Sequence, residues 1–375
     1  MTEHLSKIPD GMRYYTGAAA SLRRAVEDCA MSVFDGWSFE EVIMPTVDYF
    51  ALFARGMGAE ARRAFRFTDS DGSLLALRPD ITSSVARAAA TLLADRPRPL
   101  RLSYAAPVYR QSQKSQAEWR RESTQLGCEL IGARGDLADL EMLAIAAEVL
   151  QQLGLEGRYC ITINNVEVFN GIAERLELDE AARARMRALI DVRDGAELQR
   201  FMDAYDTTAE ERKVFSRLTR LSGKREILDL ARGVITNPRS VAALAALEKV
   251  WLGIESLGLS KTFEIDLGDL AALDYYTGLV FKIYVDGLGA RVGRGGRYDR
   301  LTENFGRAEP AIGFVLDLDG LTEVLVRSGR SRLDGRASDY SIIEGADAAD
   351  VFREAARRRA GGERIRIELQ SSDYD

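Results

Sequence analysis

The sequence predicts an α+β protein in which strands and flanking helices surround a long helical insertion. Three observations support this class. Strand-like runs bounded by turn or loop signals occur at residues 100–110 and 121–132 and again at residues 279–287. Residues 170–258 lie between these strands and carry mostly helical spacing with scattered charge. Residues 327–375 indicate a linker followed by a small β-α-β segment.

Composition limits the class of protein and its partners. A chain of 375 residues with 29% charged and 46% hydrophobic residues can bury a sizeable core and is not globally disordered. The formal net charge is −7. Because proteins that grip polyanions usually carry surplus Lys and Arg, nucleic acids and anionic membranes are disfavoured as partners, although a local basic patch is still compatible with this charge.

Cysteine and histidine usage excludes several kinds of chemistry. Cys29, Cys128 and Cys160 are far apart and form no C-x-x-C motif, which predicts neither a disulfide framework nor a zinc site. The single histidine, His4, lies in a polar N-terminal stretch, so histidine acid–base catalysis is not expected. We predict no cofactor. The start of the chain lacks an apolar signal core and no run of about 20 apolar residues occurs, which predicts a cytoplasmic protein.

The first elements follow from periodicity and from breaker residues. Apolar residues recur at helical spacing over residues 18–34, and Gly36 is placed to end that helix. Residues 39–50 predict a strand that Pro45 interrupts. Residues 73–95 then predict a strand, a turn and a helix.

The middle elements lead into the part of the chain with the most polar strands. In residues 73–95 the turn falls at Pro79, and Thr82 is a candidate N-cap for the helix. The strands at 100–110 and 121–132 are joined by a polar loop. Residues 137–153 then predict a strongly amphipathic helix that Gly154 ends.

The last elements complete two predicted domains. Strands resume at 262–268 and 279–287, with a hairpin turn at residues 286–289. We predict a core of residues 1–326 that contains the helical insertion. The C-terminal part, 327–375, is predicted to contain a linker at 327–339, a strand at 340–345, a helix at 348–359 and a strand at 364–370.

The strand at 123–131 carries the clearest candidate binding groups. Period two divides it into one polar face and one core-like face: Ser123, Gln125, Gly127 and Glu129 against Thr124, Leu126, Cys128 and Leu130. The glycine leaves room above the strand, and an amide beside a carboxylate suits a small ligand with an ammonium or imidazole group. Taken alone, the strand slightly favours a solvated sheet face.

Three other segments are weaker candidates. Arg78, Asp80 and Thr82 lie at a strand-to-helix junction, for which the simpler interpretation is a helix cap with a surface Arg–Asp pair. The glycine-rich residues 293–301 follow a hairpin and lack a Gly-Lys-Ser/Thr ending, so close packing of glycines in a sheet is favoured over a phosphate loop. Residues 268–278 resemble one wall of a small-molecule pocket.

In their order and spacing, these motifs carry a specific resemblance. "LRPDIT", "RESTQLGCELIG", "LDYYTGLVF", "GGRYD" and "AIGFVLDLDGL" resemble the catalytic core of histidyl-tRNA synthetases, a class II synthetase fold, over roughly residues 5–325. The resemblance implies an antiparallel sheet flanked by helices. It also implies dimerisation through a region that ends at a proline, here Pro45.

Departures from the synthetase pattern affect the adenylation chemistry. Ala271 and Gly320 stand where the synthetases have arginines, and Arg110 is followed by Ser112 where they have a glutamate. Adenylation needs positive groups to stabilise charge on the phosphates, and loss of one such group typically removes about 3 kcal/mol of transition-state stabilisation. The chain also ends about 50 residues after the core, which is too short for an anticodon-binding domain.

The amino-acid side of the synthetase site is retained. By resemblance, Asp80, which replaces a glutamate, and Thr82 hold the α-amino group of histidine with Gln125 beside them. Glu129 and Tyr276 contact the imidazole and Arg110 the carboxylate. The predicted histidine-binding residues are therefore Asp80, Thr82, Arg110, Gln125, Glu129, Tyr275, Tyr276 and Tyr298.

A synthetase-like chain without adenylation groups resembles the regulatory subunits of ATP phosphoribosyltransferase. That resemblance implies a catalytically silent chain that dimerises with itself and assembles with a short-form catalytic subunit. Such a complex performs the first step of histidine biosynthesis, with histidine as its feedback inhibitor. An active histidyl-tRNA synthetase is the disfavoured alternative, and a free-standing amino-acid sensor is left open. Neither the stoichiometry nor the choice between this pocket and a subunit interface for histidine follows from the sequence.

Overall fold

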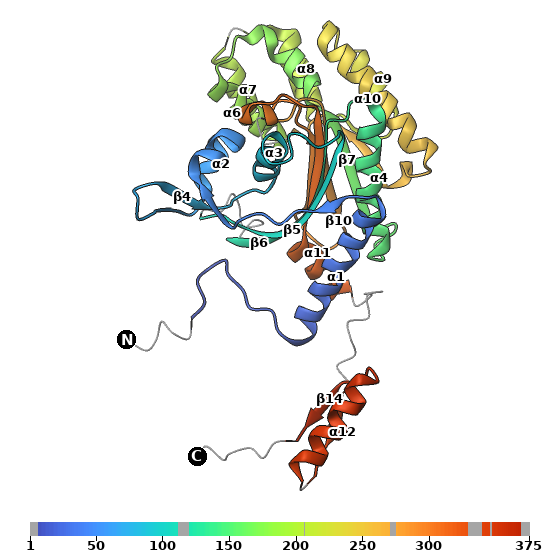
Figure 1. Cartoon of the computed structure of the whole chain (residues 1–375). Helices are drawn as coiled ribbons and strands as arrows, with labels where there is room; N and C mark the ends of the chain where they lie inside the picture. The colour runs from blue at the N-terminus through green and yellow to red at the C-terminus, as the bar shows by residue number, and fades with distance from the viewer. Residues whose placement is uncertain are drawn as a thin grey trace.

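A nine-stranded sheet forms the centre of the molecule (Figure 1). The computed structural model describes residues 7–111, 120–205, 207–270, 275–328, 340–345 and 347–368. In spatial order the strands are β1 (Glu40–Glu41), β5 (Leu100–Tyr109), β6 (Glu122–Ile131), β12 (Ala311–Asp317), β11 (Arg291–Arg297), β10 (Leu279–Val285), β7 (Tyr159–Asn165), β9 (Phe263–Asp266) and β8 (Ser222–Gly223).

The sheet is antiparallel through its centre and mixed near its edges. From β5 to β7 and between β8 and β9, neighbouring strands are antiparallel, as the resemblance implies. The expectation is wrong for two pairs, because β1 pairs with β5 and β7 pairs with β9 in parallel. In both cases helices lie between the paired strands in the sequence, which supplies the long crossover that parallel pairing requires.

Helices cover both faces of the sheet. α1 (Gly17–Gly36), α4 (Asp136–Gln152) and α10 (Pro238–Ser256) lie on one side, whereas α2 (Phe50–Met57) and α3 (Thr82–Ala90) lie on the other (Figure 1). The predicted core face of β6 is confirmed, since its apolar side chains join the main core with residues of α1 and α4: Leu126, Cys128, Leu130, Phe34 and Met142.

Helix α4 is not strongly amphipathic, contrary to the prediction from residues 137–153. It contacts α1, α10 and β12, so it is enclosed on several sides. Its buried residues therefore extend around most of the helix, from Ala138 through Leu143 to Leu150. The first helix also runs slightly further than predicted, because Gly36 is its last residue and the C-cap is Trp37.

Helices fill the region in which the spacing predicts an insertion. They are α5 (Val166–Ala173), η3 (Glu174–Leu176), α6 (Glu180–Asp191), α7 (Gly195–Asp203), α8 (Ala209–Leu218), α9 (Glu226–Arg232) and α10. Their buried side chains, among them Met186, Phe201 and Phe215, belong to the same apolar cluster as the central sheet. The region therefore packs as an extension of the main core. η4 (Ser260–Thr262) then leads into β9.

A second, three-stranded sheet lies beside α2. Its strands are β2 (Val47–Tyr49), β4 (Leu74–Leu77) and β3 (Arg66–Thr68), with β4 in the middle. The predicted interruption at Pro45 is confirmed, because residues 39–50 divide between β1 in the large sheet and β2 in the small one. Leu52, Phe53 and Ala76 fill the space between this sheet, α2 and η1 (Gly58–Arg63).

The C-terminal segment has the predicted β-α-β order. β13 (Ser341–Ile343) and β14 (Ile365–Ile367) pair in parallel, with α12 (Ala348–Ala360) between them in the sequence. The division into domains at residue 326 stays a prediction. Across the part of the chain that the structure describes, no helix combines the length and apolar character needed to cross a membrane.

Candidate histidine site

Glu129 on β6 is the centre of the candidate site. Its side chain is only 1% exposed, and three hydroxyl groups donate hydrogen bonds to it. Thr82 Oγ1 and Tyr104 Oη donate to Oε1 at 2.8 and 2.9 Å, and Tyr298 Oη donates to Oε2 at 2.6 Å. A carboxylate has about four acceptor positions, so one position is left for another donor.

Burial controls the protonation of this carboxyl group. Removal from water raises the pKa of Glu129 from its ordinary value of 4.5 to about 7, although the hydrogen bonds from Tyr298, Thr82 and Tyr104 oppose this rise. The negative charge of Asp80 adds to it. Glu129 therefore changes charge near neutral pH, where a cationic ligand would favour the ionised form.

Two glycines make space for the polar side chains of the site. A Cβ at Gly313 on β12, which is opposite Glu129 in the sheet, would overlap Glu129 Oε2. A Cβ at Gly296 on β11 would lie 2.8 Å from the ring of Tyr276, closer than carbon atoms approach. The glycine-rich strand thus serves close packing in a sheet, as predicted, and does not form a phosphate loop.

The strand-to-helix junction before α3 is buried, which contradicts the simpler interpretation of a surface pair. Asp80 is 2% exposed, and Arg78 donates to the backbone oxygens of Met44 and Pro107, both at 2.7 Å. The predicted cap at Thr82 is also wrong. Asp80 accepts from the backbone N–H of Ser83 at 3.2 Å, whereas the Thr82 hydroxyl is directed to Glu129.

Six of the eight predicted residues surround one small cavity of about 10 Å³: Asp80, Thr82, Glu129, Tyr275, Tyr276 and Tyr298. A volume of this size holds about one water molecule. Tyr275 and Tyr276 form part of its wall with their ring centres 4.8 Å apart. An imidazole ring is larger than this volume, so it can enter only when side chains of the cavity wall shift.

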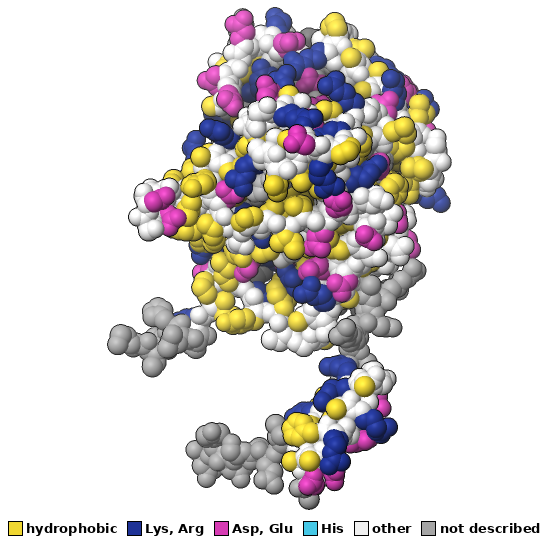
Figure 2. Space-filling view, viewed as in Figure 1, with side chains coloured by type: hydrophobic (Ala, Val, Ile, Leu, Met, Phe, Trp, Pro, Cys, Tyr) yellow, Lys and Arg dark blue, Asp and Glu magenta, His cyan; other side chains and the backbone are white. Residues whose placement is uncertain are grey.

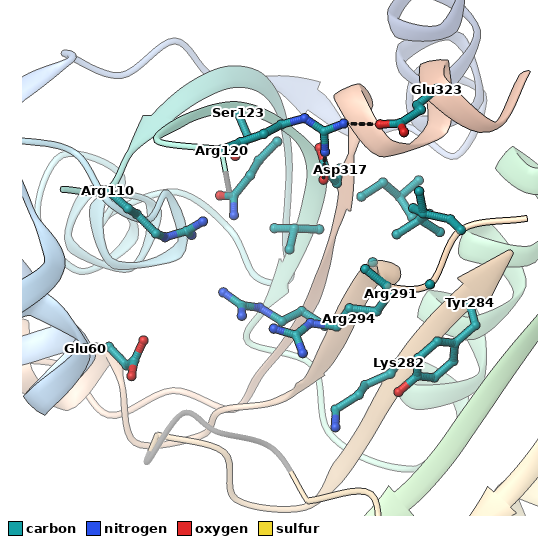
Figure 3. A pocket seen from close by; sticks show the side chains of 18 of the residues that line it. Glu60, Arg110, Arg120, Ser123, Lys282, Tyr284, Arg291, Arg294, Asp317 and Glu323 are labelled. Carbon is teal, nitrogen blue, oxygen red and sulfur yellow. Dashed lines mark hydrogen bonds and ion pairs between the residues drawn. The ribbon is translucent and has the colours of Figure 1, made fainter. Parts of the chain in front are cut away.

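The other two predicted residues, Arg110 and Gln125, line a larger cavity of about 590 Å³. Figure 3 shows Arg110, Arg291 and Arg294 pointing into this space. Arg294 and Val315 line both cavities, so the two adjoin. The eight predicted residues therefore occupy one continuous region, with the carboxylates at the narrow end and Arg110 at the wide end.

The polar face of β6 is buried, so the solvated sheet face favoured by that strand alone is wrong. Gln125 is 6% exposed, and its Oε1 is buried without a hydrogen-bond partner. Gly127 does not leave open room above the strand. Tyr104 occupies that space, since its hydroxyl would lie 2.7 Å from a Cβ at Gly127.

Sequence reasoning missed Tyr104 and Arg294, although signals for both exist. Tyr104 on β5 is paired with Gly127 on β6. Because glycine has no side chain, the ring of a tyrosine on the neighbouring strand can lie over it. Arg294 shares a strand face with Gly296 by period two, so it points toward the same pocket. Lys282, which also lines the larger cavity, could not be predicted from the sequence, because its ion-pair partner Asp191 is distant in the chain.

At the position of the missing ATP-binding arginine, Gly320 lies in the first turn of α11 (Leu318–Ser328). The neighbouring Asp319 accepts hydrogen bonds from Tyr15 at 2.6 Å and from the backbone N–H of Thr124 at 2.9 Å. Ala271, Ser112 and His4 lie outside the described residues. Over the described ranges, no three His, Cys, Asp or Glu side chains gather as metal ligands.

Comparison with known proteins identifies the family. The histidyl-tRNA synthetase family model matches residues 11–321. The ATP phosphoribosyltransferase regulatory subunit of Moorella thermoacetica is 37% identical over 97% of this chain and 92% of its own length. The protein of that name from Desulfitobacterium hafniense strain Y51 is 32% identical over 97% of this chain and 92% of its own length.

A solved structure agrees with this assignment. The crystal structure of an ATP phosphoribosyltransferase regulatory subunit/histidyl-tRNA synthetase from Bacillus halodurans superposes with a TM-score of 0.86 and 28% identity, covering 99% of this chain and 94% of the other. The chain therefore belongs to the family of ATP phosphoribosyltransferase regulatory subunits, which is built on the histidyl-tRNA synthetase fold.

Proposed function

We propose that this chain is the histidine-sensing regulatory subunit of a cytoplasmic ATP phosphoribosyltransferase, and that it assembles with a short-form catalytic subunit for the first step of histidine biosynthesis. The observation that carries the proposal is the buried Glu129 carboxylate with one remaining acceptor position, beside Asp80 and a wall of tyrosines. Buried carboxylates of this kind are stabilised by a cation or a strong donor.

The roles of the site residues follow from their positions. The Glu129 carboxylate and Tyr276 accept and position the imidazole at the narrow end of the region. Asp80 and Thr82 lie beside them for the α-ammonium group, and the unpaired Oε1 of Gln125 supplies a further acceptor. Arg110 lines the wide end, where a positive group suits the α-carboxylate.

In this proposal the chain binds histidine but does not activate it with ATP. Gly320 brings no positive group to the end of the cavity where Asp317 lies. Burial and the charge of Asp319 raise the pKa of Asp317, and this carboxyl group supplies no positive charge for a triphosphate. The site is therefore suited to holding an amino acid and not to activating it.

Self-association is part of the proposal. Apolar side chains are exposed on β2, β3 and β4 and in the segment around Pro45: Ile43, Val47, Tyr49, Phe67 and Leu74. Hydrophobic side chains gather on the side of the molecule where β4 and α2 lie (Figure 2). A contiguous apolar patch on one face is typical of a protein interface.

Reconstitution tests the proposal. Phosphoribosyl transfer by the short-form catalytic subunit is measured alone, with this chain, and with this chain plus histidine. We expect this chain to raise the activity and to introduce inhibition by histidine, with a coupling of typically about 5–150-fold in affinity. Rates and inhibition that this chain leaves unchanged would refute the regulatory role.

A further inference from the structure

The turn that follows β9 is a buried part of the backbone next to the histidine site in sequence. It begins at Asp266, the last residue of β9, and it includes Asp269, which precedes Tyr275 by six positions. The two aspartates are 5% and 8% exposed. Asn164 on β7 donates to the backbone oxygens of Leu267 and Asp269, both at 3.2 Å. The chain is therefore fixed on the sheet shortly before it reaches the tyrosines of the cavity wall.

A lysine joins this turn to the helical insertion. Lys282 on β10 forms ion pairs with Asp269 and, at 2.6 Å, with Asp191, the last residue of α6. The hydroxyl group of Thr162 on β7 donates to the other carboxylate oxygen of Asp269. The Lys282 side chain is only 12% exposed, so water screens its attraction for the two carboxylates weakly. A single ammonium group thus holds one carboxylate from the insertion and one from the turn.

A second ion pair joins the same two regions with the charges reversed. Arg193 lies two positions beyond the end of α6 and forms an ion pair with Asp266. Among the other elements, α6 packs mainly against α7. The end of α6 is therefore attached to the turn at two points, by Asp191 through Lys282 and by Arg193 directly.

The other side of the tyrosine pair is attached to the core of the sheet. The backbone N–H of Thr277 donates to the backbone oxygen of Arg297 at 2.8 Å, and the backbone N–H of Asp299 donates to the Thr277 hydroxyl at 3.0 Å. The Arg297 guanidinium group forms an ion pair with the buried Asp139 of α4. The position of the tyrosines therefore depends on the helical insertion only from the side of the Lys282 ion pairs.

We propose that Lys282 is a positioning residue for histidine binding, and that through Asp191 and Asp269 it couples the attachment of α6 to the tyrosine wall of the site. This inference rests on the proposed function and adds a connection between the histidine site and the helical insertion. A histidine molecule that holds Tyr275 and Tyr276 in place should then also stabilise α6, because such coupling is reciprocal. α6 contributes no residue to the small cavity at Glu129, so direct contact does not explain this effect.

Electrostatics explains why the lysine is needed. Burial raises the pKa of Asp191, the charge of Lys282 opposes this rise, and the charge of Asp269 adds to it. Without Lys282 the two carboxylates would repel each other in a largely buried position, and the end of α6 would separate from the turn. The tyrosine wall would then have to be ordered during histidine binding, and this ordering lowers the affinity.

Calorimetric titration with histidine, on the full chain and its variants, measures the effect. Lys282→Met should weaken histidine binding about twofold to thirtyfold, the range typical of a substitution between two coupled sites. Lys282→Arg keeps the charge and should restore most of the affinity, whereas Lys261→Met, at an exposed position of η4, should change nothing. An equal loss in Lys282→Met and Lys261→Met, or no loss in either, would overturn the inference.

Asp191→Asn tests the connection from the side of the insertion. It should also weaken histidine binding, and its effect should not add to that of Lys282→Met, because both changes break the same bridge. Full additivity would overturn the inference. Melting curves verify the fold of each variant. If Lys282→Met does not fold, Asp191→Asn alone decides, and unchanged histidine affinity in that variant would refute the coupling.

Hydrogen exchange of the full chain separates a positioning role from a merely structural one. In the wild type, histidine should slow exchange in residues 180–191 as well as in residues 275–278, and in Lys282→Met it should slow exchange in 275–278 alone. Protection of 275–278 without 180–191 in the wild type would refute the coupling and leave the histidine site in place.

The same samples without histidine keep the inference separate from the proposed function. If histidine does not bind at all, the proposed histidine site fails, and the coupling is decided by comparing wild type with Lys282→Met. Exchange in Lys282→Met should then be faster in both segments, 180–191 and 275–278. Faster exchange in only one segment, or in neither, would overturn the coupling.

Discussion

Glu129 combines two properties that are usually separate in one side chain. It is 1% exposed, so ionisation costs free energy, yet three hydroxyl groups are already oriented to stabilise the ionised form. The site is therefore arranged for a negative charge that the three hydroxyl groups alone only partly stabilise. A ligand that brings a positive charge or a strong donor completes the arrangement.

Glu129→Gln should weaken histidine binding about tenfold to a hundredfold. The change removes a charge-assisted hydrogen bond, worth roughly 1.5–3 kcal/mol, and is nearly isosteric. Calorimetric titration of the complex with histidine measures the loss, and Glu303→Gln, at an exposed position, is the control. Unchanged affinity in Glu129→Gln would place the regulatory histidine elsewhere, for example at a subunit interface.

The pKa of Glu129 also predicts a pH dependence of stability. Because its folded pKa of about 7 exceeds the ordinary value of 4.5, the folded state holds its proton more tightly. The stabilisation is fully present below pH 4.5 and is lost as the pH rises through about 7, a difference of roughly 3 kcal/mol.

Urea unfolding of the histidine-free chain at several pH values measures this dependence. Other buried carboxyl groups, such as Asp139 and Asp191, also have raised pKa values, so the informative quantity is the difference between wild type and Glu129→Gln. The wild type should lose more stability than the variant between pH 5 and pH 8. Parallel curves for the two proteins would show that Glu129 does not titrate in this range.

At the scale of elements, the alternation along β6 could be predicted from sequence, and it located both Glu129 and the core face. The burial of Glu129 could not be predicted, because the groups that cover it are Tyr104, Tyr276 and α3, which are distant from it in the sequence. The same limit explains Thr82, whose hydroxyl binds Glu129 and does not cap its own helix. Local rules failed where a long-range polar contact was available.

The exposed apolar face near Pro45 predicts a dimer that depends on particular side chains. Ile43 is 88% exposed and Tyr49 57% exposed, so a charge there costs little in the monomer but opposes a dry interface. Ile43→Asp should shift the chain toward monomer in sedimentation experiments. Leu230→Asp on α9, also at an exposed position, should not. A dimer that tolerates Ile43→Asp would place the interface elsewhere.

For the whole molecule, the retained amino-acid end and the altered phosphate end predict binding without activation. ATP–pyrophosphate exchange with histidine should stay at background, because Gly320 supplies no charge to a triphosphate. An authentic histidyl-tRNA synthetase serves as the positive control. Measurable exchange above background would contradict a catalytically silent subunit.

The family and the α+β class could be inferred from motif order across the whole chain, whereas the charge of the larger cavity could not. Arg110, Arg291 and Arg294 are separated by long stretches of sequence or lie among glycines, and the net charge of −7 gave no indication of them. Arg291 and Arg294 lie on β11, whereas Arg110 follows β5. The order β5-β6-β12-β11 in the folded sheet brings these two strands to the same region. Cationic sites built this way are visible only after folding.

The absence of a side chain at Gly313 has a practical consequence for engineering. A methyl group there would occupy the position of Glu129 Oε2 and would also press on the Cys128 backbone oxygen at 2.7 Å. Gly313→Ala therefore blocks the narrow cavity by steric means while every charge and every donor stays in the chain. Producers of histidine need a complex that keeps working when the amino acid accumulates. Under the proposed function, a single added carbon atom on β12 offers a route to such an uninhibited strain, and it acts by displacing the Glu129 side chain and pressing on the backbone of β6.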